Sequence, residues 1–365
     1  MTISVILVSF TILVFYILLV ILFITGWNKI PVFTENVKST KIPVSVIVAC
    51  KNEELYLDRL LNVLKTQSQS DFELVLVNDH STDSTRLIME SAKHDFENIL
   101  IIDSLESGKK NAQKEGINNT TGELIITTDA DCEPTSTWIE SIINYYLSTY
   151  NDLIIGPVIM KSENSIFSNL QKIEFASLVG AGAGALGVGK PIMCNGANLA
   201  FTKIIWQKCK NDLHDEEISG EDVFLLHSIK KRNGKIGFLK SEKAIVKTST
   251  KESLKSFINQ RKRWTSKSKK YTDKDIIITA LIILLICVIE ILLVTVSLFQ
   301  SQYLELLLLV FGIKFVVDFV FLNQISKFFK LENLMIYSII LSFIYPFYIV
   351  YSAVSGIIEQ NIKWK

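Results

Sequence analysis

The chain has 365 residues, of which 49% are hydrophobic and 21% are charged. This composition excludes a purely soluble protein, and the length allows one full domain together with membrane spans. The 38 basic and 37 acidic residues give a net charge of +1 at pH 7, which conceals local clusters of basic residues.

The chain begins with an uncharged apolar run from Ile3 to Ile24. About 20 such residues are enough to cross a bilayer core of about 30 Å. A cleavable signal peptide is the alternative, but the run is longer than a signal core and lacks a basic n-region and a small-residue cleavage site. We therefore expect a retained transmembrane anchor at residues 1–26.

Residues 41–250 alternate short apolar runs with amphipathic stretches, a pattern typical of an α/β domain. Four runs are apolar on both faces, as buried parallel strands tend to be. They are Val44–Ala49, Glu73–Val77, Ile99–Ile102 and Leu124–Thr127. A further strand is expected at Leu199–Phe201.

Polar motifs follow three of these strands, at the edge of an open parallel sheet where ligands bind. They are Cys50-Lys51-Asn52-Glu53, Asn78-Asp79-His80-Ser81 and Asp129-Ala130-Asp131. Three motifs at one sheet edge predict a binding site there.

Asp129 and Asp131 form a D-x-D pair, in which two carboxylates can approach one divalent cation. Mg²⁺ and Mn²⁺ favour such oxygen ligands and bind alongside substrate phosphates. Helix capping by one aspartate is the alternative reading of this pair.

Asp79 and Lys109 are candidate nucleotide ligands. Ser81 or Thr82 can cap the helix after the second strand, which leaves Asp79 to accept hydrogen bonds from a nucleobase or ribose. Lys109 stands at the start of a predicted helix, where a lysine can contact a diphosphate. A solvated basic turn accounts equally well for Lys110.

Glu221 and Asp222 begin a predicted helix. Negative charge is favourable at a helix N-terminus, which is the structural explanation for the pair. The functional alternative is a general base that removes a proton from an acceptor hydroxyl as it attacks the anomeric carbon of a sugar. A single attack from the face opposite the nucleotide would invert that centre.

Residues 251–274 predict an amphipathic helix at the membrane interface. Leu254, Phe257, Ile258 and Trp264 form an apolar stripe, and Lys255, Arg261, Lys262 and Arg263 supply the cationic side. Such a helix can anchor the protein at the lipid headgroups. Arg263 neutralising a leaving diphosphate and Trp264 stacking near the acceptor are compatible with that anchor.

Residues 275–360 contain three candidate spans, Ile276–Phe299, Leu304–Leu322 and Leu334–Ile358. Interior charges at Glu290, Glu305, Lys314 and Asp318 are costly in lipid and mark either a buried pairing, such as Lys314 with Asp318, or a substrate path. Basic clusters beside the spans predict a multi-pass protein of the cell (cytoplasmic) membrane whose central domain is cytoplasmic.

The ordered motifs resemble those of membrane-bound family 2 glycosyltransferases with a GT-A fold, a group that includes polysaccharide synthases and enzymes similar to ceramide glucosyltransferase. The similarity spans most of residues 41–270 and ends in a Q-x-x-R-W motif at 260–264. It differs at His80, where many relatives carry glycine.

The resemblance implies a role for each motif. Asp79 and Glu53 lie with the nucleotide sugar, Lys109 and Asp129 complete that site, and Asp131 with Asp129 binds Mg²⁺ or Mn²⁺. Asp222 is implied as the base, beside Glu221. The remaining implied residues are Gln260, Arg263 and Trp264 over the diphosphate and acceptor, and Asn195, Gly196 and Asn198 in an acceptor-side loop, with Gly180–Gly189 as a mobile part of its wall.

The expected reaction is an inverting transfer of a hexose or N-acetylhexosamine from a nucleotide sugar, with UDP as the expected nucleotide, to a lipid or growing polysaccharide. A partner subunit or homo-oligomer is expected if the product is a polymer, and no nucleic-acid partner is expected. The alternative is a catalytically silent membrane scaffold or export subunit, but Asp131, Asp222 and Arg263 are all retained.

Overall fold

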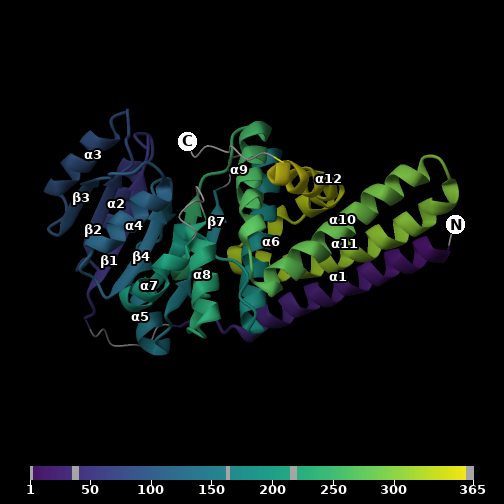
Figure 1. The fold of residues 1–365 in the computed structure, drawn as a ribbon, viewed down its shortest axis with the longest axis horizontal. Coiled ribbons are helices and arrows are strands. Elements are labelled where there is room, and N and C mark those ends of the chain that lie inside the picture. The colour runs from purple at the N-terminus through teal and green to yellow at the C-terminus, as the bar shows by residue number, and fades with distance from the viewer. Residues whose placement is uncertain (1–2, 35–40, 162–164, 214–219, 359–365) are drawn as a thin grey trace. The chain divides into compact units, whose positions relative to one another are not determined.

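The computed structural model describes residues 3–34, 41–161, 165–213 and 220–358 (Figure 1). The described residues form two compact units. The sheet unit contains residues 30–161 and 193–249, and the helical unit contains residues 3–29, 165–192 and 250–358. Each unit is therefore assembled from segments that are distant in sequence.

A seven-stranded mixed sheet forms the centre of the sheet unit, in the order β3-β2-β1-β4-β8-β6-β9. β1, β2, β3 and β4 are mutually parallel where they pair, whereas β8 runs antiparallel to β4 and β6. The strand bounds are β1 Val44–Cys50, β2 Glu73–Asn78, β3 Ile99–Asp103, β4 Leu124–Asp129, β6 Leu153–Ile155, β8 Leu199–Thr202 and β9 Ile236–Phe238. The five strands predicted from the sequence are confirmed.

β1 and β2 are buried along their whole length, as their apolar composition on both faces requires. Their register places Cys50 opposite Asn78, and Ala49 lies opposite Asp129 of β4. The polar motifs that follow these strands therefore begin at neighbouring positions on one edge of the sheet.

Six α-helices accompany the sheet, and a small second sheet has the order β5-β10-β7. In α2, the leucines at positions 57, 60, 61 and 64 are buried, which is the spacing of one helical face. The bounds are α2 Leu57–Lys65, α3 Thr85–Ser91, α4 Lys109–Asn119, α5 Trp138–Thr149, α7 Lys203–Cys209, α8 Glu221–Lys231, β5 Glu133–Pro134, β7 Val158–Met160 and β10 Val246–Thr248.

The helical unit consists of α1 Ile3–Lys29, α6 Ile166–Gly187, α9 Leu254–Ser266, α10 Lys274–Ser297, α11 Leu304–Phe329 and α12 Tyr337–Ile358. Within the described residues, three helical stretches are long and apolar enough to cross a membrane: Ile3–Lys29, Lys274–Ser297 and Tyr337–Gly356. α11 contains the expected span Leu304–Leu322 and is 26 residues long, but it is not among these three.

α6 differs from the expectation for its sequence. The stretch Gly180–Gly189, expected as a mobile part of an acceptor-side wall, is helical through Gly187 and packs on α1 in the helical unit. A Cβ atom added at Gly26 of α1 would lie 1.7 Å from the carbonyl oxygen of Gly184. The glycines therefore let two backbones touch, as small residues do between membrane helices.

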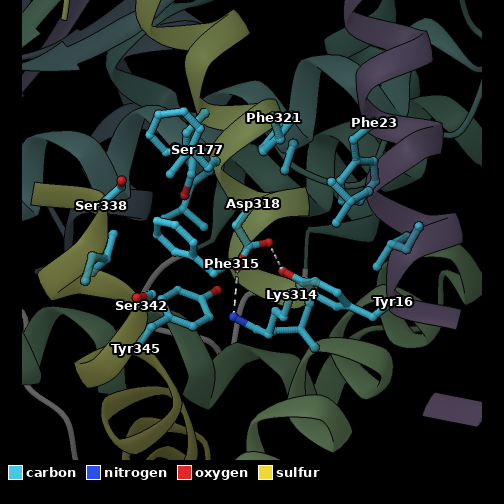
Figure 2. Close-up of a pocket in the computed structure, with 18 residues that line it drawn as sticks. Tyr16, Phe23, Ser177, Lys314, Phe315, Asp318, Phe321, Ser338, Ser342 and Tyr345 are labelled. Atoms are coloured by element: carbon cyan, nitrogen blue, oxygen red, sulfur yellow. Dashed lines mark hydrogen bonds and ion pairs between the residues drawn. The ribbon is translucent and has the colours of Figure 1, made fainter. Parts of the chain in front are cut away.

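Two interior charges of the helical unit, Lys314 and Asp318, form an ion pair (Figure 2). Lys314 Nζ lies 2.9 Å from Asp318 Oδ2 and 3.9 Å from Glu290 Oε2, which confirms the predicted pairing of Lys314 with Asp318. The hydroxyl of Tyr16 donates to Asp318 Oδ1 at 2.5 Å. Lys314, Asp318 and Tyr16 border a cavity of about 100 Å³ whose other walls are mostly apolar.

Candidate active site

Asp79 lies at the end of β2 and its side chain is fully buried. The backbone N–H of Gly108 donates to both carboxylate oxygens, at 3.0 Å each. Lys51 Nζ lies 3.4 Å from Oδ2, and His80 Nδ1 lies 3.2 Å from Oδ1. These bonds connect Asp79 to the turn that leads into α4.

His80 occupies the position at which many relatives have glycine, and its φ angle is +54°. That value lies in the left-handed region, where glycine is favoured and most other residues are strained. The departure from the family pattern therefore falls on a backbone position suited to glycine, while the neighbouring Asp79 keeps its place.

The loops after β1 and β2 are joined by reciprocal hydrogen bonds. The N–H of Thr82 donates to Asn52 Oδ1 at 2.8 Å, and the N–H of Asn52 donates to Ser81 Oγ at 3.1 Å. Glu53 is buried beside them, and its N–H donates to Thr85 Oγ1 at 2.7 Å. The predicted role of Glu53 in nucleotide-sugar binding remains a prediction.

Lys109 is the first residue of α4, directly after Gly108, whose φ angle is +120°. Its Nζ lies 2.6 Å from Asp129 Oδ1 at the end of β4. Burial lowers the pKa of Lys109, but the negative charges of Asp129, Glu221 and Asp222 outweigh it and raise the pKa well above its usual value. Lys109 is therefore a fixed cation amid three carboxylates.

Asp129 is the last residue of β4 and Asp131 lies in the turn that follows it, and both are partly exposed. Among the described residues, no group of three or more His, Cys, Asp or Glu side chains is arranged to hold a metal ion. Two carboxylates nevertheless fit a Mg²⁺ or Mn²⁺ ion that takes its remaining ligands from substrate phosphates and water. Burial, together with the charges of Asp131 and Asp129, also raises the pKa of the neighbouring Cys132 thiol.

The loop at residues 195–198 is held against β4. Thr127 Oγ1 donates to the carbonyl of Gly196 and Thr128 Oγ1 donates to that of Ala197, both at 2.9 Å. Asn195 Oδ1 accepts the N–H of Ala197 at 3.0 Å and so caps a short 3₁₀ turn. The predicted acceptor-side loop therefore lies beside the strand that carries the D-x-D motif.

Asn198 differs from the other members of this loop because its side chain is fully buried. Its Oδ1 accepts from Trp138 Nε1 at 2.9 Å, and its Nδ2 donates to the carbonyls of Pro157 and Ala244 at 2.9 and 2.8 Å. These bonds engage the amide at both ends. The predicted acceptor-side role of Asn198 remains a prediction.

Asp222 lies in the first turn of α8, as the sequence suggested. Its Oδ2 accepts the N–H of Gly196 at 3.0 Å, and its Oδ1 accepts the N–H of Val223 at 2.8 Å. Glu221 Oε2 accepts the N–H of Gly220 at 2.9 Å. The predicted base and the predicted acceptor-side loop are therefore in direct contact.

Lys51 belongs to the polar motif expected after β1, but no role in the site was predicted for it. It follows β1 by one residue, and Asp79 follows β2 by one residue. Because Cys50 is in register with Asn78, the residue after each strand faces the other. Strand register was the signal that would have paired Lys51 with Asp79.

The Q-x-x-R-W residues lie on α9, within the helical unit. The expected cationic face is divided, because Arg261 and Lys262 are buried while Lys255 is exposed. The expected apolar stripe is also incomplete, since Leu254 is exposed. α9 nevertheless packs against α6 and α12 through the remaining stripe residues and Arg261. Phe257 contacts Phe167 of α6 and Tyr348 of α12, Trp264 contacts Phe175 of α6, and Arg261 pairs with Glu174 of α6.

Comparison with known proteins finds a family match over the residues that form this edge of the sheet. Residues 45–207 match the family model for glycosyl transferase family 2. These residues form a family 2 glycosyltransferase domain. The family 2 match includes Asp79, Lys109, Asp129, Asp131 and the 195–198 loop, and it ends before Asp222 and α9.

Two curated relatives share parts of the family 2 domain. Glycosyltransferase AglE from Haloferax volcanii is 29% identical over 118 residues, which cover 32% of this chain and 39% of that protein. Poly-beta-1,6-N-acetyl-D-glucosamine synthase from Staphylococcus aureus is 29% identical over 144 residues, which cover 38% of this chain and 34% of that protein. The chain thus matches between a third and two fifths of the length of these relatives.

A solved structure extends the similarity in fold. The mannosyltransferase PcManGT from Pyrobaculum calidifontis, in complex with GDP-Man and Mn²⁺, aligns with a TM-score of 0.57. The alignment covers 93% of this chain and 97% of that one, at 14% sequence identity. The family 2 domain therefore has a GT-A fold, and apolar helices occur on both sides of it in the chain.

Proposed function

We propose that the chain is an inverting glycosyltransferase that moves a hexose or N-acetylhexosamine from a UDP-sugar to a lipid or growing polysaccharide at the cytoplasmic face of the cell membrane. The observation that carries this proposal is the set of three carboxylates near Lys109. Asp129 lies 2.6 Å from its Nζ, and Glu221 and Asp222 are close enough to raise its pKa. One cation among three carboxylates is an arrangement suited to a substrate that brings both phosphates and a divalent metal.

The metal would be held by Asp129 and Asp131, with the donor diphosphate supplying further oxygen ligands. Bound there, a divalent ion would neutralise the negative charge that develops on the leaving diphosphate. Lys109 would hold the diphosphate at the start of α4, and Asp79 with Lys51 would fix the nucleotide end of the site. Glu53 completes the proposed nucleotide-sugar side.

Asp222 would remove the proton from the acceptor hydroxyl. Its Oδ2 accepts a hydrogen bond from the Gly196 backbone, which orients the carboxylate beside the loop proposed to contact the acceptor. The proton passes from the hydroxyl oxygen to the carboxylate as that oxygen bonds to the anomeric carbon and the bond to the diphosphate breaks. The roles of Gln260, Arg263 and Trp264 at the diphosphate and acceptor rest on the family resemblance.

Nucleotide release by the purified protein in lipid tests the proposal. UDP-glucose, UDP-galactose, UDP-N-acetylglucosamine and GDP-mannose are offered in turn with Mn²⁺ or Mg²⁺ and a membrane lipid extract as acceptor. We expect release from one UDP-sugar and a fall of about 10²- to 10⁴-fold in Asp222→Asn. The nucleotide dissociation constant of that variant should stay within about twofold, because its amide oxygen can still accept the Gly196 N–H.

Two results would contradict the proposal. Release that is unchanged in Asp222→Asn would remove the base assignment. Absence of release from every donor would favour the silent scaffold. Sizing the product then separates polymer synthesis from the transfer of one sugar.

A further inference from the structure

Asp79 is a buried carboxylate whose acceptor positions are occupied by groups of the sheet unit. Its Oδ1 accepts the N–H of Gly108 at 3.0 Å and lies 3.2 Å from Nδ1 of His80. Its Oδ2 accepts the same N–H at 3.0 Å and a hydrogen bond from Lys51 Nζ at 3.4 Å. Two carboxylate oxygens offer about four acceptor positions, and the Asp79 side chain is 0% exposed. A donor group on a nucleotide would therefore have to displace one of these partners.

His80 extends this buried carboxylate to the surface of the sheet unit. Its side chain is 51% exposed, although its partner Asp79 is not exposed at all. An ionised carboxylate only accepts hydrogen bonds, so Nδ1 of His80 carries the hydrogen that it donates to Asp79. In the neutral ring, the other nitrogen, Nε2, is then an acceptor. The two residues together present one acceptor, with a fixed tautomer, at the edge of the sheet.

The turn that carries His80 is held by the side chain of Asn78. Asn78 Oδ1 accepts the N–H of Ser81 at 3.1 Å, and Asn78 Nδ2 donates to Asp103 Oδ1 at 2.8 Å. The φ angle of His80 is +54°, a conformation that glycine adopts with less strain. Glycine would therefore serve the backbone of this turn at least as well, and the turn alone does not account for an imidazole.

We propose that His80 is a specificity-determining residue that recognises the nucleobase of the donor, with Asp79 as its orienting support. Nε2 of His80 would accept a hydrogen bond from the imino N3–H of uracil. Cytosine has no hydrogen on N3, so a uracil nucleotide would be selected over a cytosine nucleotide. The inference deepens the proposed function and rests on it, because that function places the nucleotide end of the site at Asp79 and Lys51.

Two variants separate this role from a structural one. His80→Gly suits the backbone, and His80→Asn keeps a residue that tolerates the left-handed conformation while removing the imidazole. Titration calorimetry on the purified protein in lipid, with Mn²⁺ at pH 8, where imidazoles are ordinarily neutral, measures the dissociation constants of three nucleotides. They are UDP, N3-methyl-UDP, which has no imino hydrogen, and CDP, which lacks that hydrogen without an added methyl group.

We expect the wild type to bind UDP at least about tenfold more tightly than either of the other two nucleotides, as the loss of one hydrogen bond predicts. Both variants should bind all three nucleotides within about twofold of one another. The melting temperature of both variants should equal that of the wild type, because glycine and asparagine adopt the backbone conformation of His80.

Donor kinetics supply a second readout. The nucleobase takes no part in bond breaking, so its contact contributes equally to the ground state and the transition state. The KM for the UDP-sugar should therefore rise about tenfold in His80→Gly, while kcat stays within about twofold. His94→Asn is the matched control, because His94 is another exposed histidine of the sheet unit, and it should change none of these values.

The outcomes distinguish this inference from the proposed function. A preference for UDP that persists in His80→Gly would refute the inference, since another group would then recognise N3–H. Weaker binding with a lower melting temperature in both variants would assign His80 to the structure of the turn. A wild type that shows His80-dependent selection of UDP but transfers no sugar would support the inference and refute the proposed function. A wild type that binds no UDP would refute both.

Discussion

The ammonium of Lys109 donates to Oδ1 of Asp129 at 2.6 Å, which joins the first residue of α4 to the last residue of β4. A side-chain cation thus neutralises a carboxylate that is proposed to bind the metal. If Asp129 is a metal ligand, the ion and Lys109 would compete for it until a donor supplies phosphates for the ammonium.

Lys109→Met should reveal this competition. Removing the ammonium leaves Asp129 available, so Mn²⁺ without nucleotide should bind about tenfold more tightly, as expected from the loss of a charge-assisted hydrogen bond. The KM for the donor should rise because the diphosphate loses its cation. Isothermal titration with Mn²⁺, with and without UDP, measures both effects.

Lys93→Met is the control for that experiment, because Lys93 is an exposed lysine of the sheet unit that pairs with Glu90. It should change neither constant. An Mn²⁺ affinity in Lys109→Met equal to that of the wild type would show that the pair does not compete with the metal.

Gly108→Ala should weaken the donor site through the backbone. No atom lies within 4 Å of the added Cβ, so no collision is expected. The φ angle of +120° is instead strained for alanine by about 1–3 kcal/mol. Relief of that strain would move the N–H away from Asp79, and we expect a several-fold higher KM for the donor and a lower melting temperature. An unaltered KM together with unaltered melting would contradict this account.

Gly26→Ala should disrupt the contact between α1 and α6, because its Cβ would lie 1.7 Å from the Gly184 carbonyl oxygen. We expect a marked fall in the melting temperature measured in lipid or detergent. Gly312→Ala is the matched control, since nothing lies within 4 Å of that Cβ on α11. Alanine there should be neutral or stabilise the helix by up to about 1 kcal/mol. Equal melting of the two variants would rule out the close backbone contact.

Lys314→Met should destabilise the helical unit by about 3–5 kcal/mol, because it leaves Asp318 and Glu290 without their buried cation. Adding Asp318→Asn removes one of the two uncompensated charges and should recover part of the loss. Thermal unfolding of both variants in the same detergent measures this. A double variant less stable than Lys314→Met would refute the proposed charge balance.

The edge of the sheet was predictable because its signals are local. Each apolar strand ends at a polar motif, and parallel neighbours bring those ends together, so Asp79, Asp129 and their loops could be placed together from the sequence. The Lys314–Asp318 pair was predictable for the same reason, since one helical turn separates the two residues.

The long-range arrangements were not predictable in this way. The glycine-rich sequence of α6 is typical of a loop, because glycine is a poor helix former. The helix is favoured by close contact with α1, which lies more than 150 residues earlier in the chain. The hydrogen bond from Trp138 to Asn198 joins residues 60 positions apart, which no local signal predicts. From the sequence, Arg261 is expected to be a surface cation, and only the structure shows that it is buried in an ion pair with Glu174.

In the described residues, the chain begins in the helical unit with α1, passes through the seven strands β1–β7 of the sheet unit, and returns to the helical unit with α6. It then adds β8, β9 and β10 to the sheet unit before α9. During synthesis, the described residues of the sheet unit up to Ser249 are therefore made before α9. At about 5–20 residues per second, the remaining stretch to the end of α12 takes several seconds more. Glu174 of α6 is therefore synthesised before both of its partners, and its carboxylate has neither Arg261 nor Tyr348 until α9 and then α12 follow.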